Sequence, residues 1–136
     1  MPTLEAEISS IVQGDGVDIT VNIGKVTGDF VGDAVTKVWF TVKNSASDTD
    51  ANALFQKVIT GTNVPGTGVI LDDGSVSGTA QVRVELVNAD TSLLTNPKKA
   101  YPFDLQVETT NGGATKPYTP WLGHIKPYAE RTRATS

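Results

Sequence analysis

Strict alternation of apolar and polar residues is the feature that most constrains this chain. Residues 17–23, VDITVNI, place Val17, Ile19, Val21 and Ile23 on one side and polar residues on the other. Successive side chains of a β-strand point to opposite faces, so the pattern predicts a half-buried strand. Segments 34–43, 79–87 and 101–107 repeat the alternation, and 13 Gly and 7 Pro favour many turns between short strands. The sequence therefore predicts an all-β domain.

Two of these segments, 34–43 and 101–107, supply strongly apolar faces. Tyr101 begins the second segment, and we expect its ring at the edge of the core and its hydroxyl bonded to backbone in the preceding turn, as in a tyrosine corner. Trp39 lies on the opposite face of its strand from the core residues, so we expect it to pack under a loop or to belong to a contact surface. The expected core residues of the two strands are Val38, Phe40, Val42, Tyr101, Phe103, Leu105 and Val107.

Turn-forming residues predict how the strands connect. Residues 13–16, QGDG, predict a hairpin between an N-terminal strand within 3–12 and the strand at 17–23. Asn111-Gly112-Gly113 predicts a second hairpin. Pro117 and Pro120 limit the last strand to a sheet edge or to its own later half, because proline cannot donate a ladder hydrogen bond.

Two connections have helical rather than turn character. Residues 44–56 and 88–94 combine N-cap residues with Ala and Leu, which predicts one or two short helical turns. About seven to eight short strands without a βαβ rhythm are typical of a two-sheet Greek-key sandwich of immunoglobulin-like type, with a jelly roll as the alternative. The length of 136 residues suits one domain, which we place at 1–128, followed by a C-terminal tail at 129–136.

Composition narrows the possible functions. The chain has no cysteine, which excludes disulfides, thiolate chemistry and cysteine-based zinc sites. The net charge of −4, with mixed signs along the chain, gives no reason to expect nucleic acid as a partner. No apolar run reaches membrane-spanning length, and the first residues have neither a basic leader nor an apolar stretch.

The residues that could carry chemistry are few. His124 is the only histidine and has no evident triad or metal partner in the sequence. No serine lies in a Gly-x-Ser-x-Gly elbow. The oxygen ligands that could bind calcium do not follow the twelve-residue calcium-loop spacing, and turn aspartates ordinarily bond local backbone amides. We expect no enzyme activity, cofactor or metal; the carboxylates considered were Asp15, Asp18, Asp48, Asp50, Asp72 and Asp73.

Aromatic and basic residues are the remaining candidates for binding. Three aromatic residues lie in the C-terminal stretch, which supports a carbohydrate-binding or adhesin module as one alternative function. The candidate partner contacts are Trp39, Tyr118, Trp121, Tyr128, Arg131 and Arg133.

Three segments together resemble a family of small immunoglobulin-like domains encoded by tailed bacteriophages, similar to the N-terminal domain of siphophage upper-baseplate proteins. The segments are 32–60, 74–94 and 98–127. The pattern comprises a valine-aromatic-valine strand, an Asp-Thr turn, a Tyr-x-aromatic-Asp-aliphatic-Gln strand and a glycine in the last strand. It covers about residues 15–127, and the matching residues are Val38, Phe40, Val42, Asp90, Thr91, Tyr101, Phe103, Asp104, Gln106 and Gly123.

The resemblance implies a non-enzymatic virion protein that is assembled in the cytoplasm of the bacterial host. Such a module would dock on neighbouring tail, baseplate or capsid proteins, and symmetric repetition or homo-oligomerisation would strengthen modest individual contacts. Capsid decoration on the same fold is an alternative. We expect two departures from upper-baseplate proteins, which continue after the sandwich into fibre or receptor-binding regions. Here the sandwich is expected to stand as a module of its own, and the last segment, 119–136, is longer than the final strand of the family.

Overall fold

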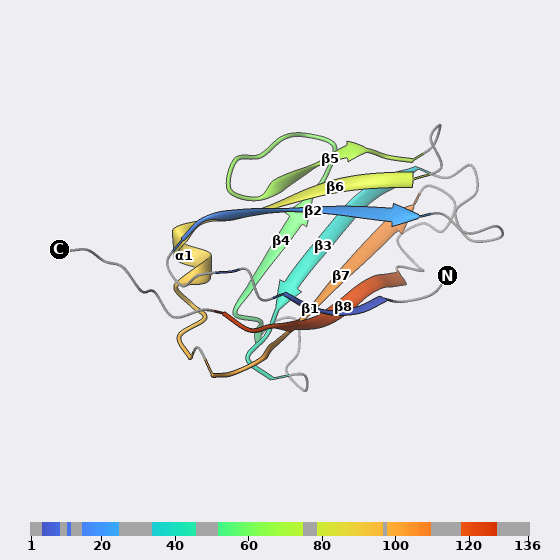
Figure 1. The fold of residues 1–136 in the computed structure, drawn as a ribbon. Helices are drawn as coiled ribbons and strands as arrows, with labels where there is room; N and C mark the ends of the chain where they lie inside the picture. The colour runs from blue at the N-terminus through green and yellow to red at the C-terminus, as the bar shows by residue number, and fades with distance from the viewer. Residues whose placement is uncertain are drawn as a thin grey trace.

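The computed structural model describes residues 4–8, 11, 15–24, 34–45, 52–74, 79–96, 98–109 and 118–127, and only the backbone of 4–8, 24 and 118–121. The described chain forms eight β-strands and one short helix (Figure 1). The elements are β1 (Leu4–Ile8), β2 (Val17–Gly24), β3 (Val35–Val42), β4 (Phe55–Ile59), β5 (Gly68–Asp72), β6 (Thr79–Leu86), α1 (Asn88–Thr91), β7 (Tyr101–Thr109) and β8 (Tyr118–Ile125).

The strands form two sheets that pack face to face. One is a five-stranded sheet with the order β1-β8-β7-β3-β4, and the other is a three-stranded sheet with the order β2-β6-β5. All neighbouring pairs are antiparallel except β1 and β8, which are parallel. The orders β8-β7-β3-β4 and β2-β6-β5 correspond to the G-F-C-C′ and B-E-D strands of an immunoglobulin sandwich. The predicted fold class, an all-β immunoglobulin-like sandwich, is confirmed, and the jelly-roll alternative is not the observed topology.

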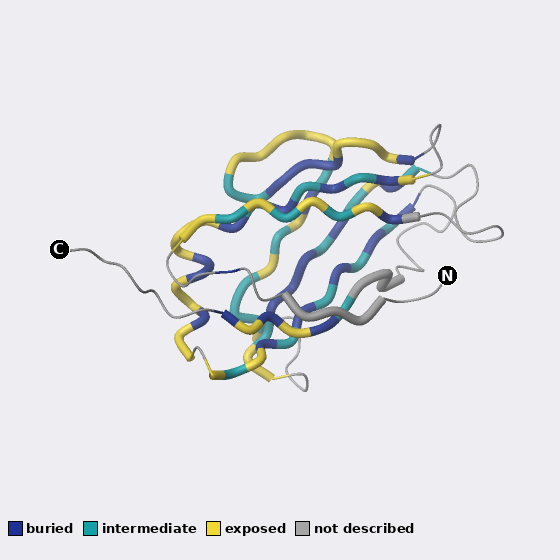
Figure 2. The backbone as a smooth tube through the Cα atoms, viewed as in Figure 1, coloured by how far each residue is buried: buried dark blue, intermediate teal, exposed yellow. Residues whose placement is uncertain are grey.

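The core lies between the two sheets, and along β6 the inward buried residues alternate with half-buried ones (Figure 2). β7 alternates buried and half-buried residues along its whole length. Phe40 of β3 and Phe103 of β7 have ring centroids 5.6 Å apart. In antibody domains these strands contribute a tryptophan and one half of an inter-sheet disulfide; here an aromatic pair fills that position. All seven predicted core residues, Val38, Phe40, Val42, Tyr101, Phe103, Leu105 and Val107, are buried.

The tyrosine corner predicted at Tyr101 is also present. The Tyr101 side chain is 2% exposed, and its hydroxyl oxygen accepts a hydrogen bond of 2.9 Å from the backbone N–H of Asn96. The hydroxyl therefore holds the turn before β7 against the strand. This contact explains why a tyrosine rather than a phenylalanine starts the strand.

The predicted hairpin between the first two strands is wrong. β1 pairs with β8, with Leu4 opposite Trp121 and Ile8 opposite Ile125, whereas β2 pairs with β6 in the other sheet. Turn-forming residues such as 13–16 reverse the chain direction equally well within a sheet or between two sheets. Alternation alone therefore could not assign β1 to its partner.

The prolines were predicted to limit the last strand either to a sheet edge or to its own later half, and the structure shows the second. β8 lies between β7 and β1 rather than at an edge. Its pairing with β1 begins at Trp121, immediately after Pro120. The pairing of β8 with β7 is irregular between Tyr118 and Trp121, so Pro120 falls where the ladder is interrupted.

The other predicted connections have mixed outcomes. The helical turn expected within 88–94 is α1, and residues 60–67 connect β4 to β5. A methyl group added at Gly68, which has φ +134°, would lie 2.1 Å from the carbonyl oxygen of Arg83, so only glycine fits there. The hairpin at Asn111-Gly112-Gly113 and residues 46–51 of the predicted helical turn within 44–56 lie outside the described residues.

Candidate interaction surface

Trp39 lies on the outer face of the five-stranded sheet. Its neighbours in β3, Val38 and Phe40, point into the core, so strand alternation places the indole outside. Across the sheet Trp39 faces Val58 of β4 and Gln106 of β7. The indole is half-buried, whereas Val58 is 45% exposed.

A cation lies beside the indole ring. The Lys37 ammonium is 5.5 Å from the centroid of the Trp39 ring, a distance that allows a cation–π contact. Next along β3, Thr41 is buried to 1% exposure, and its hydroxyl accepts a hydrogen bond of 2.8 Å from the Gln56 amide. This face therefore carries an aromatic and aliphatic centre with hydrogen-bonded polar residues beside it, a composition found in protein interfaces.

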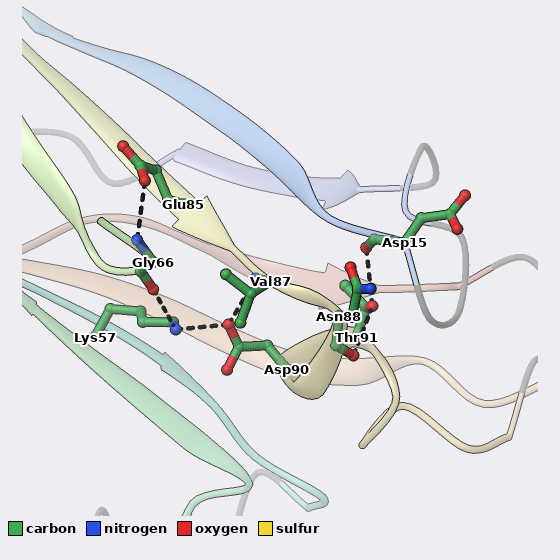
Figure 3. Close-up of polar contacts among 8 residues, drawn as sticks. All are labelled: Asp15, Lys57, Gly66, Glu85, Val87, Asn88, Asp90 and Thr91. Atoms are coloured by element: carbon green, nitrogen blue, oxygen red, sulfur yellow. Dashed lines mark hydrogen bonds and ion pairs between the residues drawn. The ribbon is translucent and has the colours of Figure 1, made fainter. Parts of the chain in front are cut away.

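A polar network joins the edge of this sheet to the other sheet and to α1 (Figure 3). Lys57 points inward from β4, because its strand neighbours Gln56 and Val58 are exposed. Its ammonium lies 2.6 Å from the Asp90 carboxylate and donates a hydrogen bond of 2.7 Å to the Gly66 carbonyl. The side chains of Lys57 and Asp90 are 11% and 13% exposed, so this ion pair is largely shielded from water.

The Asp90 carboxylate also organises the start of α1. It accepts a hydrogen bond of 2.9 Å from the backbone N–H of Val87, which precedes the helix. The Thr91 hydroxyl donates a hydrogen bond of 2.9 Å to the Asp15 carbonyl, which ties α1 to the segment before β2. Asp90 and Thr91 thus hold the connection between the sheets in place, and both belong to the turn that the resemblance highlighted.

Glu85 completes the network from β6. Its carboxylate accepts a hydrogen bond of 3.0 Å from the backbone N–H of Gly66 and pairs with the Arg83 guanidinium at 3.0 Å. The Gly66 hydrogen bond is the main cause that lowers the pKa of Glu85, and Arg83 adds to it. Gly66, with φ +82°, is therefore held by Lys57 through its carbonyl and by Glu85 through its N–H.

A shallow hollow of about 540 Å³ lies where β3 begins and β5 ends. Its polar lining residues are Thr36, Asp72 and Asp73. Asp72 accepts a hydrogen bond of 2.8 Å from the backbone N–H of Gly74, as expected for an aspartate in a turn. The two adjacent carboxylates belong to one turn and do not face each other across a cleft, the arrangement that glycoside hydrolysis requires.

The structure places only some of the residues that the sequence suggested for binding. Trp39 lies on the outer sheet face as described, and His124 is exposed on β8. The backbones of Tyr118 and Trp121 lie in β8, opposite Val107 and Leu105. The side chains of Tyr118 and Trp121, and the whole of Tyr128, Arg131 and Arg133, lie outside what is described.

Two residues of this region were missed by the sequence reasoning. Val58 was not recognised as the neighbour of Trp39, because strand pairing across β3 and β4 cannot be read from either strand alone. Lys57 had a usable signal, since it occupies the apolar phase of the strand Phe55–Ile59. A charge in that phase indicates a buried partner, which proved to be Asp90.

Among the residues with described positions, no three His, Cys, Asp or Glu side chains are grouped so that they could hold a metal ion. No helix in that part of the chain is long and apolar enough to cross a membrane. Asp15 and Asp18 are exposed, whereas Asp48 and Asp50 are not in the described ranges.

Comparison with known proteins gives a likeness at the level of structure. No family model matches the chain, and no curated protein matches its sequence. The solved structures similar to it include that of murine CRIg, an immunoglobulin-like domain, at 11% sequence identity and a TM-score of 0.40. That alignment covers 92% of this chain and 92% of the CRIg chain.

Proposed function

We propose that this protein is a non-enzymatic structural component of a tailed-phage virion. It would dock on a neighbouring tail, baseplate or capsid protein and act as a module repeated within a symmetric assembly. The sequence resemblance to phage immunoglobulin-like domains supports the class of protein, and Val38, Phe40, Tyr101 and Phe103, which contribute to that resemblance, fill the core.

The observation that carries the docking role is the pair formed by Trp39 and Val58. Trp39 is half-buried on the outer sheet face, and Val58 beside it is 45% exposed. Interfaces draw much of their affinity from a tryptophan or tyrosine surrounded by weaker contacts. The same face, covered by a repeated neighbour, would become the buried centre of a contact.

Location in the particle is the first test of this proposal. Purified phage particles from the host that carries the gene would be probed by quantitative mass spectrometry and by labelled antibody. Enrichment on the tail supports the tail or baseplate role, and enrichment on the capsid supports decoration. Absence from purified particles would overturn the virion assignment.

A matched pair of variants tests the surface itself. Trp39→Ala should leave the domain folded but reduce its incorporation into particles by about tenfold or more, since interface tryptophans are often worth more than 2 kcal/mol. The control is Leu71→Ala, which removes a 48% exposed aliphatic side chain from β5 in the other sheet. Equal incorporation of the two variants would contradict the role of Trp39.

A carbohydrate-binding module is the second candidate, because a half-exposed indole can also stack on a sugar ring. A glycan array probed with the intact protein separates the two roles. Binding that is lost in Trp39→Ala or Trp121→Ala, with incorporation into particles unchanged, would favour the glycan role.

A further inference from the structure

β2 differs from the other three edge strands of the sandwich. β1, β4 and β5 have five residues each, whereas β2 has eight. β4 carries the inward Lys57, and β5 has an irregular register. These are recognised devices that discourage edge-to-edge pairing. β2 contains neither lysine nor proline and pairs with β6 without a register shift over all eight residues.

The free side of β2 can be identified from the hydrogen bonds of β6. The Glu85 N–H donates to the Thr67 carbonyl, on the β5 side of β6. Backbone groups of an antiparallel strand alternate in direction, so those of Val84 and Val82 point to β2 instead. Ile19 and Val21 lie opposite these two residues. The remaining backbone groups of β2, those of Asp18, Thr20 and Asn22, therefore point away from β6.

The inner face of β2 is incompletely covered. Val17, Ile19 and Val21 point toward the core but are only half-buried, whereas Val82 and Val84 beside them on β6 have no exposed surface. The sheet that contains β2 has three strands, and the sheet facing it has five. A further strand beside β2 would extend the smaller sheet and cover this apolar row.

The charged residue on the outer face of β2 indicates which charge an added strand should carry opposite it. Asp18 is exposed and lies directly opposite Glu85, a like-charge pair across β2 and β6. Glu85 is engaged by Arg83 and Gly66, whereas Asp18 is exposed on the edge strand, next to the position that an added strand would take. A lysine or arginine opposite Asp18 would form a favourable cross-strand pair, and an acidic residue there would be unfavourable.

We propose that β2 binds an extended segment of another protein by strand addition. The segment alternates apolar and polar residues, with a basic residue opposite Asp18; its apolar side chains cover Val17, Ile19 and Val21, and its backbone pairs with Asp18, Thr20 and Asn22. Main-chain hydrogen bonds provide affinity in this mode, and alternate side chains provide specificity. The proposal does not depend on the virion assignment, and it concerns the sheet opposite Trp39.

The test uses the intact protein and the blocked peptide Thr-Val-Lys-Val-Thr-Val-Lys-Val-Thr, with a matched peptide in which glutamate replaces both lysines. Isothermal titration calorimetry would measure affinity, and NMR would locate binding from the amide shifts. We expect saturable binding of the lysine peptide, shifts centred on Asp18, Thr20 and Asn22, and about fivefold weaker binding of the glutamate peptide. The protein variant Asp18→Lys should reverse this preference.

Changes that remove a single backbone N–H test which groups of β2 and of the peptide make hydrogen bonds. Thr20→Pro should abolish peptide binding while the domain stays folded, because this N–H points away from β6, whereas Ile19→Pro should destabilise the fold. If Thr20→Pro fails to fold, N-methylation of the peptide provides the test without altering the protein. For a segment that adds antiparallel to β2, methyl groups on the lysine and central threonine nitrogens should abolish binding, and methyl groups on the valine nitrogens should not.

Three results would overturn the proposal. The first is peptide binding without amide shifts in β2, and the second is no binding of either peptide at millimolar concentration. The third is self-association of the protein that Thr20→Pro abolishes, which would make a second copy of this chain the occupant. None of these results bears on whether the protein is found in virions.

Discussion

The two sides of the sandwich are closed in different ways. On the side of β4 and β5, the inward Lys57 is paired with Asp90, and the loop between the two strands is held by hydrogen bonds to Gly66. On the side of β2, the strand is long and regular, and its inner residues are half-buried. The first side is held by contacts among described residues, and the second is the side on which we propose strand addition.

The largest expected effect is the difference in stability lost when a side chain is truncated at the centre of the sandwich rather than on its β2 side. Phe40→Ala removes a fully buried ring that contacts Phe103, so we expect a loss of about 4 kcal/mol in the free energy of unfolding. Ile19→Ala removes a half-buried side chain and should cost about 1 kcal/mol. Urea unfolding of both variants measures the two losses. Equal losses would show that the β2 side is packed as tightly as the centre.

The ion pair on the closed side should have the next largest effect. Lys57→Met keeps the aliphatic stem but leaves the Asp90 carboxylate without its cation in a largely shielded site. We expect a loss of about 2 kcal/mol, less than for a fully buried pair. The double variant Lys57→Met with Asp90→Asn should recover part of this loss, as a double-mutant cycle would show. Additive losses would mean that the two charges do not interact.

The tyrosine corner should have a smaller effect. Tyr101→Phe keeps the buried ring but removes the acceptor of the Asn96 N–H, and we expect a loss of about 1 kcal/mol in unfolding free energy. The melting temperature should fall by a few degrees, as measured by calorimetry. No change in stability would show that the ring alone holds the corner.

The pH dependence contributed by Glu85 should be the smallest of these effects. Hydrogen bonding lowers its pKa in the folded state, so its contribution to stability is present above the unfolded pKa and is lost as pH falls through the folded pKa. The Glu85→Gln variant should therefore lose less stability than the unmodified protein between about pH 7 and about pH 3. Parallel denaturation curves at each pH would reveal the difference. Identical pH profiles would contradict the role of Gly66 and Arg83 at this carboxylate.

Period-two alternation predicted the strands and their inward residues well, because each depends only on local order along the chain. The tyrosine corner was also predictable, since Tyr101 and the turn that bonds it are close in sequence. The partner of β1 was not, because pairing with β8 depends on contacts between chain ends about 117 residues apart in sequence, as for Leu4 and Trp121.

The candidate surface was predictable only in part. Trp39 could be assigned to an outer face from its strand alone, but its neighbour Val58 depends on the register between β3 and β4. The edge position of β2 among the described strands could not be anticipated either. It follows from the strand order β2-β6-β5, which depends on pairing between segments far apart in the sequence.

Amide hydrogen exchange along β2, measured residue by residue by NMR, tests the central claim most directly. An open edge predicts alternation: the N–H groups of Ile19 and Val21, which face β6, should exchange slowly, and those of Asp18, Thr20 and Asn22 should exchange rapidly. Adding the lysine peptide should slow the rapid group. Slow exchange at all five residues in the protein alone would contradict the account, because it would mean that the chain already covers this edge.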